Sequence, residues 1–458
     1  MRAWHKHLLR TVIAVLITFC FYGALLPQAI PHPVSGYGIY DFLDEMAGNN
    51  IISLHSAVKP YTRIQIARLL DEAEAKRDRL NARQKEELDF YRRDFGRETA
   101  TFSAARKRFD LFSYKDSVFS FTVNPVFGAE IFSNSSGTAT YWRNGIEARA
   151  CVAGWGFYAS MVDNHEKPLL GKPEYLTSRA GGHIKNSTDW SEMQGGVTYS
   201  WKWGYAGLVK EKFTWGTNYH GANILGGNVP SFVHLRLHLE PVKWFTFNYF
   251  HGWLNSMVVD SSRSYWITNS YGTVYRDVYH RKFMAANLFT ITPVRNLDIS
   301  AGNSIVYSDL GLFPAYLIPV LFYKSVDHSV NSGINNMNSQ MFFDLSSRQI
   351  RHLHLYATLF IDELSVNRFF RKNEWNFLSW KGGVRTTGLL MENMYMTVEY
   401  TFNYPLTFRH FVPTLTYESN NYNLGHFLKD NSREWFINIG YRPFRGFSGE
   451  LWFEDAVR

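Results

Sequence analysis

The sequence predicts an all-β membrane protein, an antiparallel transmembrane β-barrel of about 16 to 18 strands with a small N-terminal α-helical bundle. Three observations lead to this fold. The amino terminus has the pattern of an export signal, apolar and polar residues alternate after residue 112, and short connections between strands alternate with long ones. Beyond the amino terminus no stretch supplies the roughly 20 apolar residues of a membrane-spanning helix. A barrel needs none, because only every second residue faces lipid.

Residues 1–29 have the three regions of a secretory signal peptide. The basic region contains Arg2, Lys6 and Arg10. Thr11 to Leu26 is apolar, and Ala29 is the expected cleavage residue. An uncleaved anchor helix is one alternative, because Pro27 stands where a small residue is usual, and a lipoprotein using Cys20 is another. Export through this signal predicts a location in the outer membrane of a Gram-negative cell.

Charge and cysteine content agree with a barrel. The formal net charge is +8, and no basic stripe follows any expected element, so we expect no nucleic-acid partner. Removal of the signal leaves Cys151 without a second cysteine, so no intrachain disulfide can form. A barrel is held instead by its hydrogen-bonded strands.

Residues 30–112 predict a periplasmic helical bundle. A short helix is expected over Ile39 to Met46. Two pairs have the spacing of a capping box, namely Thr62 with Gln65 and Asn81 with Gln84. The apolar faces that follow are Ile64, Ala67, Leu70 and Ala73, then Leu88, Tyr91 and Phe95. Three short helices bury little on their own, so we expect them to pack on one another and against a neighbouring structure.

Residues 113–458 predict the barrel, because the hydrophobic period changes to two. The clearest strand is Val233 to Glu240, in which four apolar residues alternate with His234, Arg236, His238 and Glu240. The same alternation is found in Leu297–Ser308, Met394–Tyr404 and 434–442. The polar faces carry charged residues that suit a water-filled lumen. A large soluble all-β protein is the alternative, and its apolar faces would pack inward.

The connections between strands come in two lengths. Short connectors begin with Pro241, Pro293 and Pro443, and proline is expected at the end of a strand. Long polar segments lie at 164–193, 255–280, 309–340 and 419–432. Short periplasmic turns and long external loops alternate in this way in transmembrane barrels.

Several stretches resemble one protein family in their order along the chain. They are Ser53–Glu72 (SLHSAVKPYTRIQIARLLDE), Tyr141–Gly145 (YWRNG), Phe213–Gly227 (FTWGTNYHGANILGG), Gly311–Ser325 (GLFPAYLIPVLFYKS), Asn335-Asn336, Leu359–Leu364 (LFIDEL) and Asn423–Arg433 (NLGHFLKDNSR). Together they resemble the Wzi family of capsule-assembly outer-membrane proteins, over nearly the whole mature chain.

The resemblance implies an 18-stranded outer-membrane barrel with a helical bundle on its periplasmic side. It also implies a lectin-like, non-catalytic protein that helps attach capsular or other surface polysaccharide to the cell. Two features depart from the family pattern. Gly226 follows Leu225 where the family has serine, and a charged tail follows Phe453 where such barrels finish on an aromatic residue. The second departure leaves the strand count and the closure of the barrel open.

No constellation of residues predicts catalysis, so we expect no enzyme and no cofactor. Metalloprotease, phosphate-loop and nucleophile-elbow patterns are missing from the sequence. His352 and His354 share a strand face, but lumen-facing histidines are the commoner explanation, and we predict no metal. Asp362 and Glu363 are adjacent, so on a strand they point to opposite faces and form no acid–base pair.

The long segments carry the candidate polysaccharide-binding residues. These are Trp190 in 164–193, and Tyr265, Trp266, Tyr271 and Tyr275 in 255–280. Aromatic rings beside hydrogen-bonding groups suit sugar recognition, since a ring offers a flat apolar face. The alternative is that these rings belong to the aromatic girdle of the barrel, as we expect for Trp142, Trp244 and Trp253.

The expected partners are surface or capsular polysaccharide and outer-membrane lipid, bound by a monomer. A diffusion channel for sugars or other small solutes is the alternative function, because the inward faces are polar. The segment Leu310–Tyr323 is apolar and contains Pro314 and Pro319. We expect this segment to fold inward from the end of a strand and to constrict the lumen.

Overall fold

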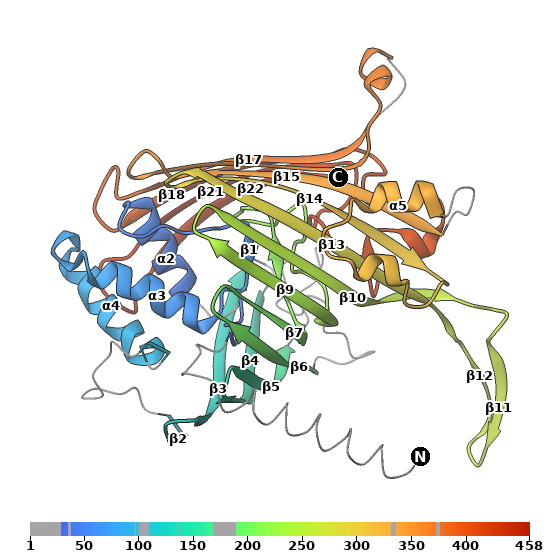
Figure 1. Cartoon of the computed structure of the whole chain (residues 1–458), viewed down its shortest axis with the longest axis horizontal. Helices are drawn as coiled ribbons and strands as arrows, with labels where there is room; N and C mark the ends of the chain where they lie inside the picture. The colour runs from blue at the N-terminus through green and yellow to red at the C-terminus, as the bar shows by residue number, and fades with distance from the viewer. Residues whose placement is uncertain are drawn as a thin grey trace, which may run out of the picture.

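A computed structural model describes residues 29–34, 38–96, 98–99, 110–135, 137–167, 189–330, 336–371 and 376–458. The expected signal peptide, apart from Ala29, lies outside these residues. The dominant feature is a 16-stranded sheet whose strands pair almost entirely in chain order. Every pairing in it is antiparallel. The sheet curls into the wall of a barrel (Figure 1).

The strands of this sheet are long. Their bounds are β2 (Phe112–Lys115), β3 (Phe119–Asn134), β4 (Gly137–Val152), β5 (Trp155–Lys167), β6 (Asp189–Trp201), β7 (Gly204–Glu211), β9 (Phe232–Val242), β10 (Phe245–Val259), β13 (Tyr279–Val294), β14 (Leu297–Ser308), β15 (Met337–Ser347), β16 (Leu353–Glu363), β17 (Phe377–Thr387), β18 (Met394–Asn403), β21 (Ser432–Tyr441) and β22 (Gly449–Val457). The count agrees with the lower end of the predicted range.

Apolar side chains of the wall face outward and polar side chains face inward, which is the reverse of a soluble protein. On β9, Val233 and Leu235 are 40% and 37% exposed, whereas the alternating His234 and Arg236 are 1% and 8% exposed. On β18 the polar residues, among them Glu399, are likewise the buried ones. The predicted alternation is therefore confirmed with its apolar face outward, which excludes a soluble all-β protein with its apolar faces packed inward.

Three helices precede the sheet, as the sequence predicts. They are α2 (Ile39–Gly48), α3 (Arg63–Glu74) and α4 (Ala82–Phe95). Both predicted capping boxes form, at Thr62 with Gln65 and at Asn81 with Gln84. Among the described residues no helix has the length and apolarity to cross a membrane.

The helices lie at the end of the barrel that carries the short turns (Figure 1). The backbone N–H of His352, between β15 and β16, donates to the Gly48 carbonyl at 2.7 Å. Asn81 donates to Asn393, between β17 and β18, at 2.9 Å. Arg348 forms a buried ion pair with Asp44 at 2.9 Å. The bundle therefore covers the end of the barrel at which the short connections gather.

Of the three connecting prolines, Pro443 follows the end of β21 as predicted, whereas the other two lie just inside a strand. Pro241 and Pro293 each lie one residue inside the end of β9 and β13 rather than after it. The pairing register shifts beside each of them, between Phe245 and Phe247 and between Ile291 and Val294. Where the register shifts, one residue of the strand donates no hydrogen bond to its neighbour. Proline fits there because it has no backbone N–H.

Most of the long connections form structure of their own at the opposite end. The segment 255–280, predicted as a loop, contains a projecting hairpin of β11 (Tyr265–Asn269) and β12 (Gly272–Arg276) (Figure 1). A short pair also forms between β19 (Glu418–Ser419) and β20 (Tyr422–Asn423). Outside the predicted long segments, β1 (Val58–Lys59), which precedes the sheet in the chain, pairs with β8 (Thr214–Trp215). The connection between β10 and β13 was predicted as a long loop, and its Thr, Val and aromatic residues form a hairpin within it because they favour strands over coil.

The two ends of the sheet are β2 and β22, and no pairing joins them within the described residues. Both faces of β22 are open, with Leu451 79% and Trp452 65% exposed. The sequence does not decide whether the barrel closes. Among the described residues, no strand pairing closes it.

The apolar segment after β14 packs outside the wall, so the prediction that it constricts the lumen was wrong. We name residues 310–330 the strap, which includes the 3₁₀ helix η4 (Pro314–Leu317) and the helix α5 (Tyr323–Val330). It lies against Asn287 of β13 and Asn303 of β14, which are paired across the two strands. Asn287 is four residues from Ile291, so both share the outer face, where Ile291 is 41% exposed.

Polar side chains of the outer wall hold the backbone of the strap. Asn287 Nδ2 donates to the carbonyls of Pro319 and Leu321 at 2.8 and 2.9 Å. Asn303 Oδ1 accepts from the Tyr323 N–H at 2.9 Å, and Tyr249 donates its hydroxyl to the Tyr316 carbonyl at 2.8 Å. Irregular backbone at membrane depth needs partners of this kind.

The other side of the strap is apolar. Leu312, Ile318, Val320 and Phe322 are 46%, 48%, 61% and 45% exposed, so they continue the lipid-facing surface of the barrel. The apolar composition that suggested an inward fold is explained by this outward surface. Two asparagines at outward positions, Asn287 on β13 and Asn303 on β14, determine that the strap packs outside. The sequence does not identify them, because it does not show which side chains of these strands point outward.

Replacing Asn287 with leucine is expected to lower the free energy of unfolding by about 1–3 kcal/mol, because two partly buried carbonyls of the strap lose their donor. The matched control is Ala301→Leu, an exposed position on the outer face of β14. Denaturant unfolding of the protein in lipid vesicles measures both. Equal stability of N287L and A301L would contradict the role given to Asn287.

Candidate functional site

The hairpin of β11 and β12 stands on a hydrogen-bonded base. The Asp260 N–H donates to the Val278 carbonyl at 2.7 Å, and Asp260 Oδ1 accepts from the N–H and hydroxyl of Ser262 at 3.1 and 2.5 Å. Arg263 bonds both Asp260 and the Tyr279 carbonyl. These donors lower the pKa of Asp260 to about 2. Asp260 is therefore ionised at every pH above the ordinary aspartate range, and its carboxylate holds the base there. This stabilisation is lost as the pH falls toward 2, because Asp260 becomes protonated.

One face of the hairpin carries an aromatic pair. Trp266 and Tyr275 are directly opposite in the strand register, with ring centroids 5.1 Å apart and planes inclined by 61°. The rings are in contact yet open, because Trp266 is 68% and Tyr275 42% exposed. Thr268 and Thr273, the next pair on this face, have hydroxyl oxygens 2.9 Å apart. The face thus combines flat apolar rings with hydrogen-bonding groups.

The other candidate residues do not join this face. Tyr265 pairs with Arg276 on the opposite face of the hairpin, and Tyr271 stands at its turn, 95% exposed. Trp190 lies on β6, where its ring is 3% exposed and stacks on Tyr141 at 6.1 Å. The structure therefore brings together Trp266 and Tyr275 and separates Tyr265, Tyr271 and Trp190 from them.

A second polar site lies inside the barrel, where the connection between β8 and β9 enters the lumen. We name residues 216–227 the lumen loop. Its entry is held by Asp344 of β15, which accepts from the Thr217 N–H at 2.6 Å and from its hydroxyl at 3.0 Å. At its exit, Tyr417 donates its hydroxyl to the Ile224 carbonyl at 3.0 Å.

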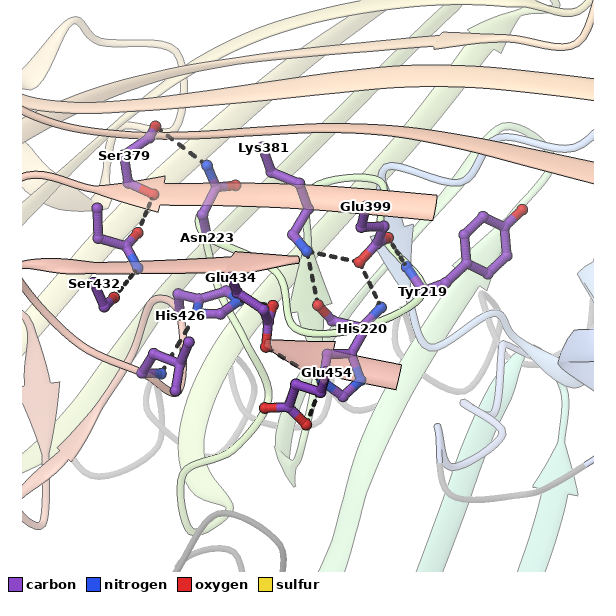
Figure 2. A network of polar contacts seen from close by, with 12 residues as sticks. Tyr219, His220, Asn223, Ser379, Lys381, Glu399, His426, Ser432, Glu434 and Glu454 are labelled. Carbon is purple, nitrogen blue, oxygen red and sulfur yellow. Dashed lines mark hydrogen bonds and ion pairs between the residues drawn. The ribbon is translucent and has the colours of Figure 1, made fainter. Parts of the chain in front are cut away.

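Glu399 of β18 is the main anchor of the lumen loop (Figure 2). Its carboxylate accepts from the N–H groups of Tyr219 and His220 at 2.7 and 3.0 Å. Lys381 of β17 donates to the same carboxylate at 2.7 Å and to the His220 carbonyl at 2.7 Å. Both charged side chains are fully buried. Such a pair is tolerated only when its hydrogen-bonding capacity is filled, and here the loop backbone fills it.

A second inserted segment, residues 404–431 between β18 and β21, meets the lumen loop, where the Gly226 N–H donates to the Leu424 carbonyl at 2.7 Å. Lys282 of β13 donates to the Thr416 carbonyl at 2.6 Å, and Asn223 of the lumen loop donates to the Ser379 carbonyl at 3.2 Å. The two segments share one apolar core with the inner wall. Its members include Ile224, Leu225, Phe250, Met284, Val306, Phe342, Phe360, Phe408, Tyr417 and Leu424. The inner wall is therefore not lined by polar residues alone, and two segments cover it from β10 to β18.

The remaining sequence candidates take structural positions. His354 has both ring nitrogens in hydrogen bonds, to the Tyr219 hydroxyl at 2.8 Å and to Ser346 at 2.9 Å, while His352 lies in a turn and bonds the Thr387 carbonyl. Asp362 accepts from Asn338 and Gln340, whereas Glu363 is exposed. The prediction that Asp362 and Glu363 form no pair is consistent with this arrangement.

The sequence alone did not single out Glu399 and Asp344 as anchors. Both occupy inward positions of strands with ordinary alternation, so their charge indicates only a polar lumen. The signal that could have pointed to them is the glycine content of 216–227, since Gly216, Gly221 and Gly227 adopt positive φ angles of 99°, 72° and 73°. Three glycines at positive φ angles indicate a loop that turns sharply and adopts one shape. Such a loop is expected to be hydrogen-bonded to neighbouring strands.

The fold was compared with known proteins. No family model and no curated protein matches the sequence. Among solved structures, Wzi of Escherichia coli matches with a TM-score of 0.60 and 11% identity, covering 94% of this chain and 85% of that one. OmpF of Salmonella typhi matches at 0.40 with 8% identity over 75% of this chain and 92% of that one. OccK3 of Pseudomonas aeruginosa matches at 0.30 with 11% identity over 74% and 89%.

The match with Wzi confirms the predicted resemblance at the level of the fold. That protein is described as an outer-membrane, carbohydrate-binding β-barrel involved in group 1 capsule assembly. The chain thus shares the β-barrel fold of Wzi.

Replacing residues 217–226 with a short Gly-Ser linker is expected to raise single-channel conductance in planar bilayers, because the lumen loop covers the inner wall. The control is a shortened β11–β12 hairpin, which lies outside the lumen and is expected to leave conductance unchanged. Wild-type protein that already conducts as well as the loop-deleted variant would contradict this view of the lumen.

Proposed function

We propose that this protein binds capsular or other surface polysaccharide at the cell exterior and helps to hold it on the cell, without catalysis. The observation that carries the proposal is the Trp266–Tyr275 pair, displayed on a hairpin that projects from the end opposite the helical bundle (Figure 1). The fold shared with Wzi, a carbohydrate-binding barrel, supports the same class of ligand.

The chemistry of the hairpin face fits a sugar chain. Two exposed rings offer apolar faces to the C–H groups of a sugar, and Thr268 and Thr273 offer hydroxyl groups beside them. The face is open rather than enclosed, so it suits one or two residues along a polymer rather than a free small molecule. Many weak contacts along one chain would then add up through multivalency.

The alternative function, a diffusion channel, receives less support. The lumen loop is fixed by Asp344 and Glu399, and its apolar side packs into the inner wall. A channel needs a continuous wet passage, whereas these contacts cover the wall from β10 to β18. Conductance of the loop-deleted variant separates the two functions.

Replacing both Trp266 and Tyr275 with alanine is expected to weaken binding of the polysaccharide from the protein's own cells by about tenfold or more, which corresponds to about 1.4 kcal/mol. The reason is the loss of both ring faces. Calorimetry or surface plasmon resonance with the purified protein measures the affinity.

The matched control is Tyr265→Ala, because Tyr265 has similar exposure but lies on the opposite face of the hairpin. Binding of this variant should equal that of the wild type. Equal losses in both variants, or binding that survives the double substitution, would count against the assigned face.

A further inference from the structure

Two histidines and two glutamates meet where the lumen loop reaches the last two strands (Figure 2). His220 comes from the lumen loop, His426 from the second inserted segment, Glu434 from β21 and Glu454 from β22. His220 Nε2 lies 3.5 Å from Glu434 Oε1 and 3.8 Å from Glu454 Oε2. His426 Nε2 lies 3.4 Å from Glu434 Oε2. The residues come from four separate segments of the chain.

Glu434 contacts the two histidines but forms no hydrogen bond with either of them. Its side chain is fully buried, and neither of its oxygens has a hydrogen-bond partner among the described residues. The Nε2 atoms of His220 and His426, which face it, are also without hydrogen bonds there. An ionised group buried in this way is costly unless a counter-charge lies at bonding distance.

We propose that these residues bind one divalent transition-metal ion, with Zn²⁺ as the preferred ion. The ligand atoms of His220, Glu434 and Glu454 all lie within 4.8 Å of one another, which is the spacing of a three-ligand site. Zinc bonds of about 2.0–2.2 Å in a tetrahedron place ligand atoms roughly 3.3–3.6 Å apart. The 3.5 and 3.8 Å separations of His220 Nε2 from Glu434 Oε1 and Glu454 Oε2 need only small adjustment to reach this geometry. These three residues are the protein ligands, water is the fourth, and His426 contacts the other oxygen of Glu434.

The ligands are held in place by groups that do not touch the ion. The His220 ring stacks on Phe436 with centroids 3.9 Å apart and planes within 1°. Glu399 and Lys381 fix the backbone of the same residue on both sides. Supporting contacts of this kind orient a metal ligand. An imidazole beside two carboxylates favours zinc over Ca²⁺ or Mg²⁺, which prefer oxygen ligands alone.

A bound ion would fasten the lumen loop to β21 and β22. Glu434 and Glu454 lie on the last two strands of the sheet, and β22 is its edge. The site would therefore act as a clamp between the inserted segments and the least supported strands of the wall. This inference does not depend on the proposed binding of polysaccharide.

The test uses the tag-free full chain in detergent, stripped with chelator and titrated with ZnCl₂ in a calorimeter, with bound metal counted by mass spectrometry. One zinc per chain is expected, together with a higher unfolding temperature. Glu434→Gln and Glu454→Gln should each weaken zinc binding at least tenfold. Co²⁺ in place of zinc should give the visible absorption of a four-coordinate site.

The control is His280→Ala, which removes a different histidine that contacts a carboxylate, Asp309, at 2.8 Å. It should bind zinc as the wild type does. Heat-dependent gel mobility verifies folding, and if E434Q does not fold, E454Q and His220→Gln decide the result. No stoichiometric zinc, or zinc held equally by the glutamate variants and the wild type, would overturn the proposal and leave protonated imidazoles as the partners of Glu434.

Discussion

Every backbone polar group that lies at membrane depth must find a partner within the protein, because lipid offers none. The long antiparallel strands meet this requirement through their ladders, and their alternation sends the apolar side chains outward. The strap obeys the same constraint by another route. Its irregular backbone lies on the lipid side of β10, β13 and β14, where Tyr249, Asn287 and Asn303 supply the missing donors and acceptors. Polar residues on an outer wall are thus explained by the backbone that they satisfy.

The same requirement applies inside the barrel. Glu399 and Lys381 are fully buried, and their charges are compensated by each other and by the backbone of the lumen loop. Removing the loop would leave both groups exposed to whatever fills the lumen, so the loop and the charged wall depend on each other. Glu434 differs, because two histidines face its carboxylate at 3.4 and 3.5 Å and no hydrogen bond reaches it from the described residues. This contrast between two glutamates on β18 and β21 motivates the proposed metal clamp.

The sequence predicted the elements well where a local pattern decides the structure. The capping boxes at Thr62 and Asn81 and the bounds of β14 are examples, since each depends on residues close together in the chain. The sequence did not predict the structure where contacts between distant segments determine it. The strap is apolar, but whether it covers the outer or the inner wall depends on Asn287 and Asn303, whose facing is set by the register of β13 with β14. Trp266 and Tyr275 were predicted in one loop with Tyr265 and Tyr271, and only the register of the hairpin shows which two share a face.

In the proposed function, an exposed aromatic face holds polysaccharide on the barrel. The lumen of that barrel is not a route of transport. The most direct measurement is the fraction of surface polysaccharide that remains attached to cells, rather than released into the medium, after the chromosomal copy is deleted and replaced. A full-length copy is expected to restore attachment, and a copy with Trp266 and Tyr275 replaced by alanine is expected to leave more polysaccharide in the medium at equal protein levels. Unchanged attachment in cells that lack the protein altogether would contradict the account.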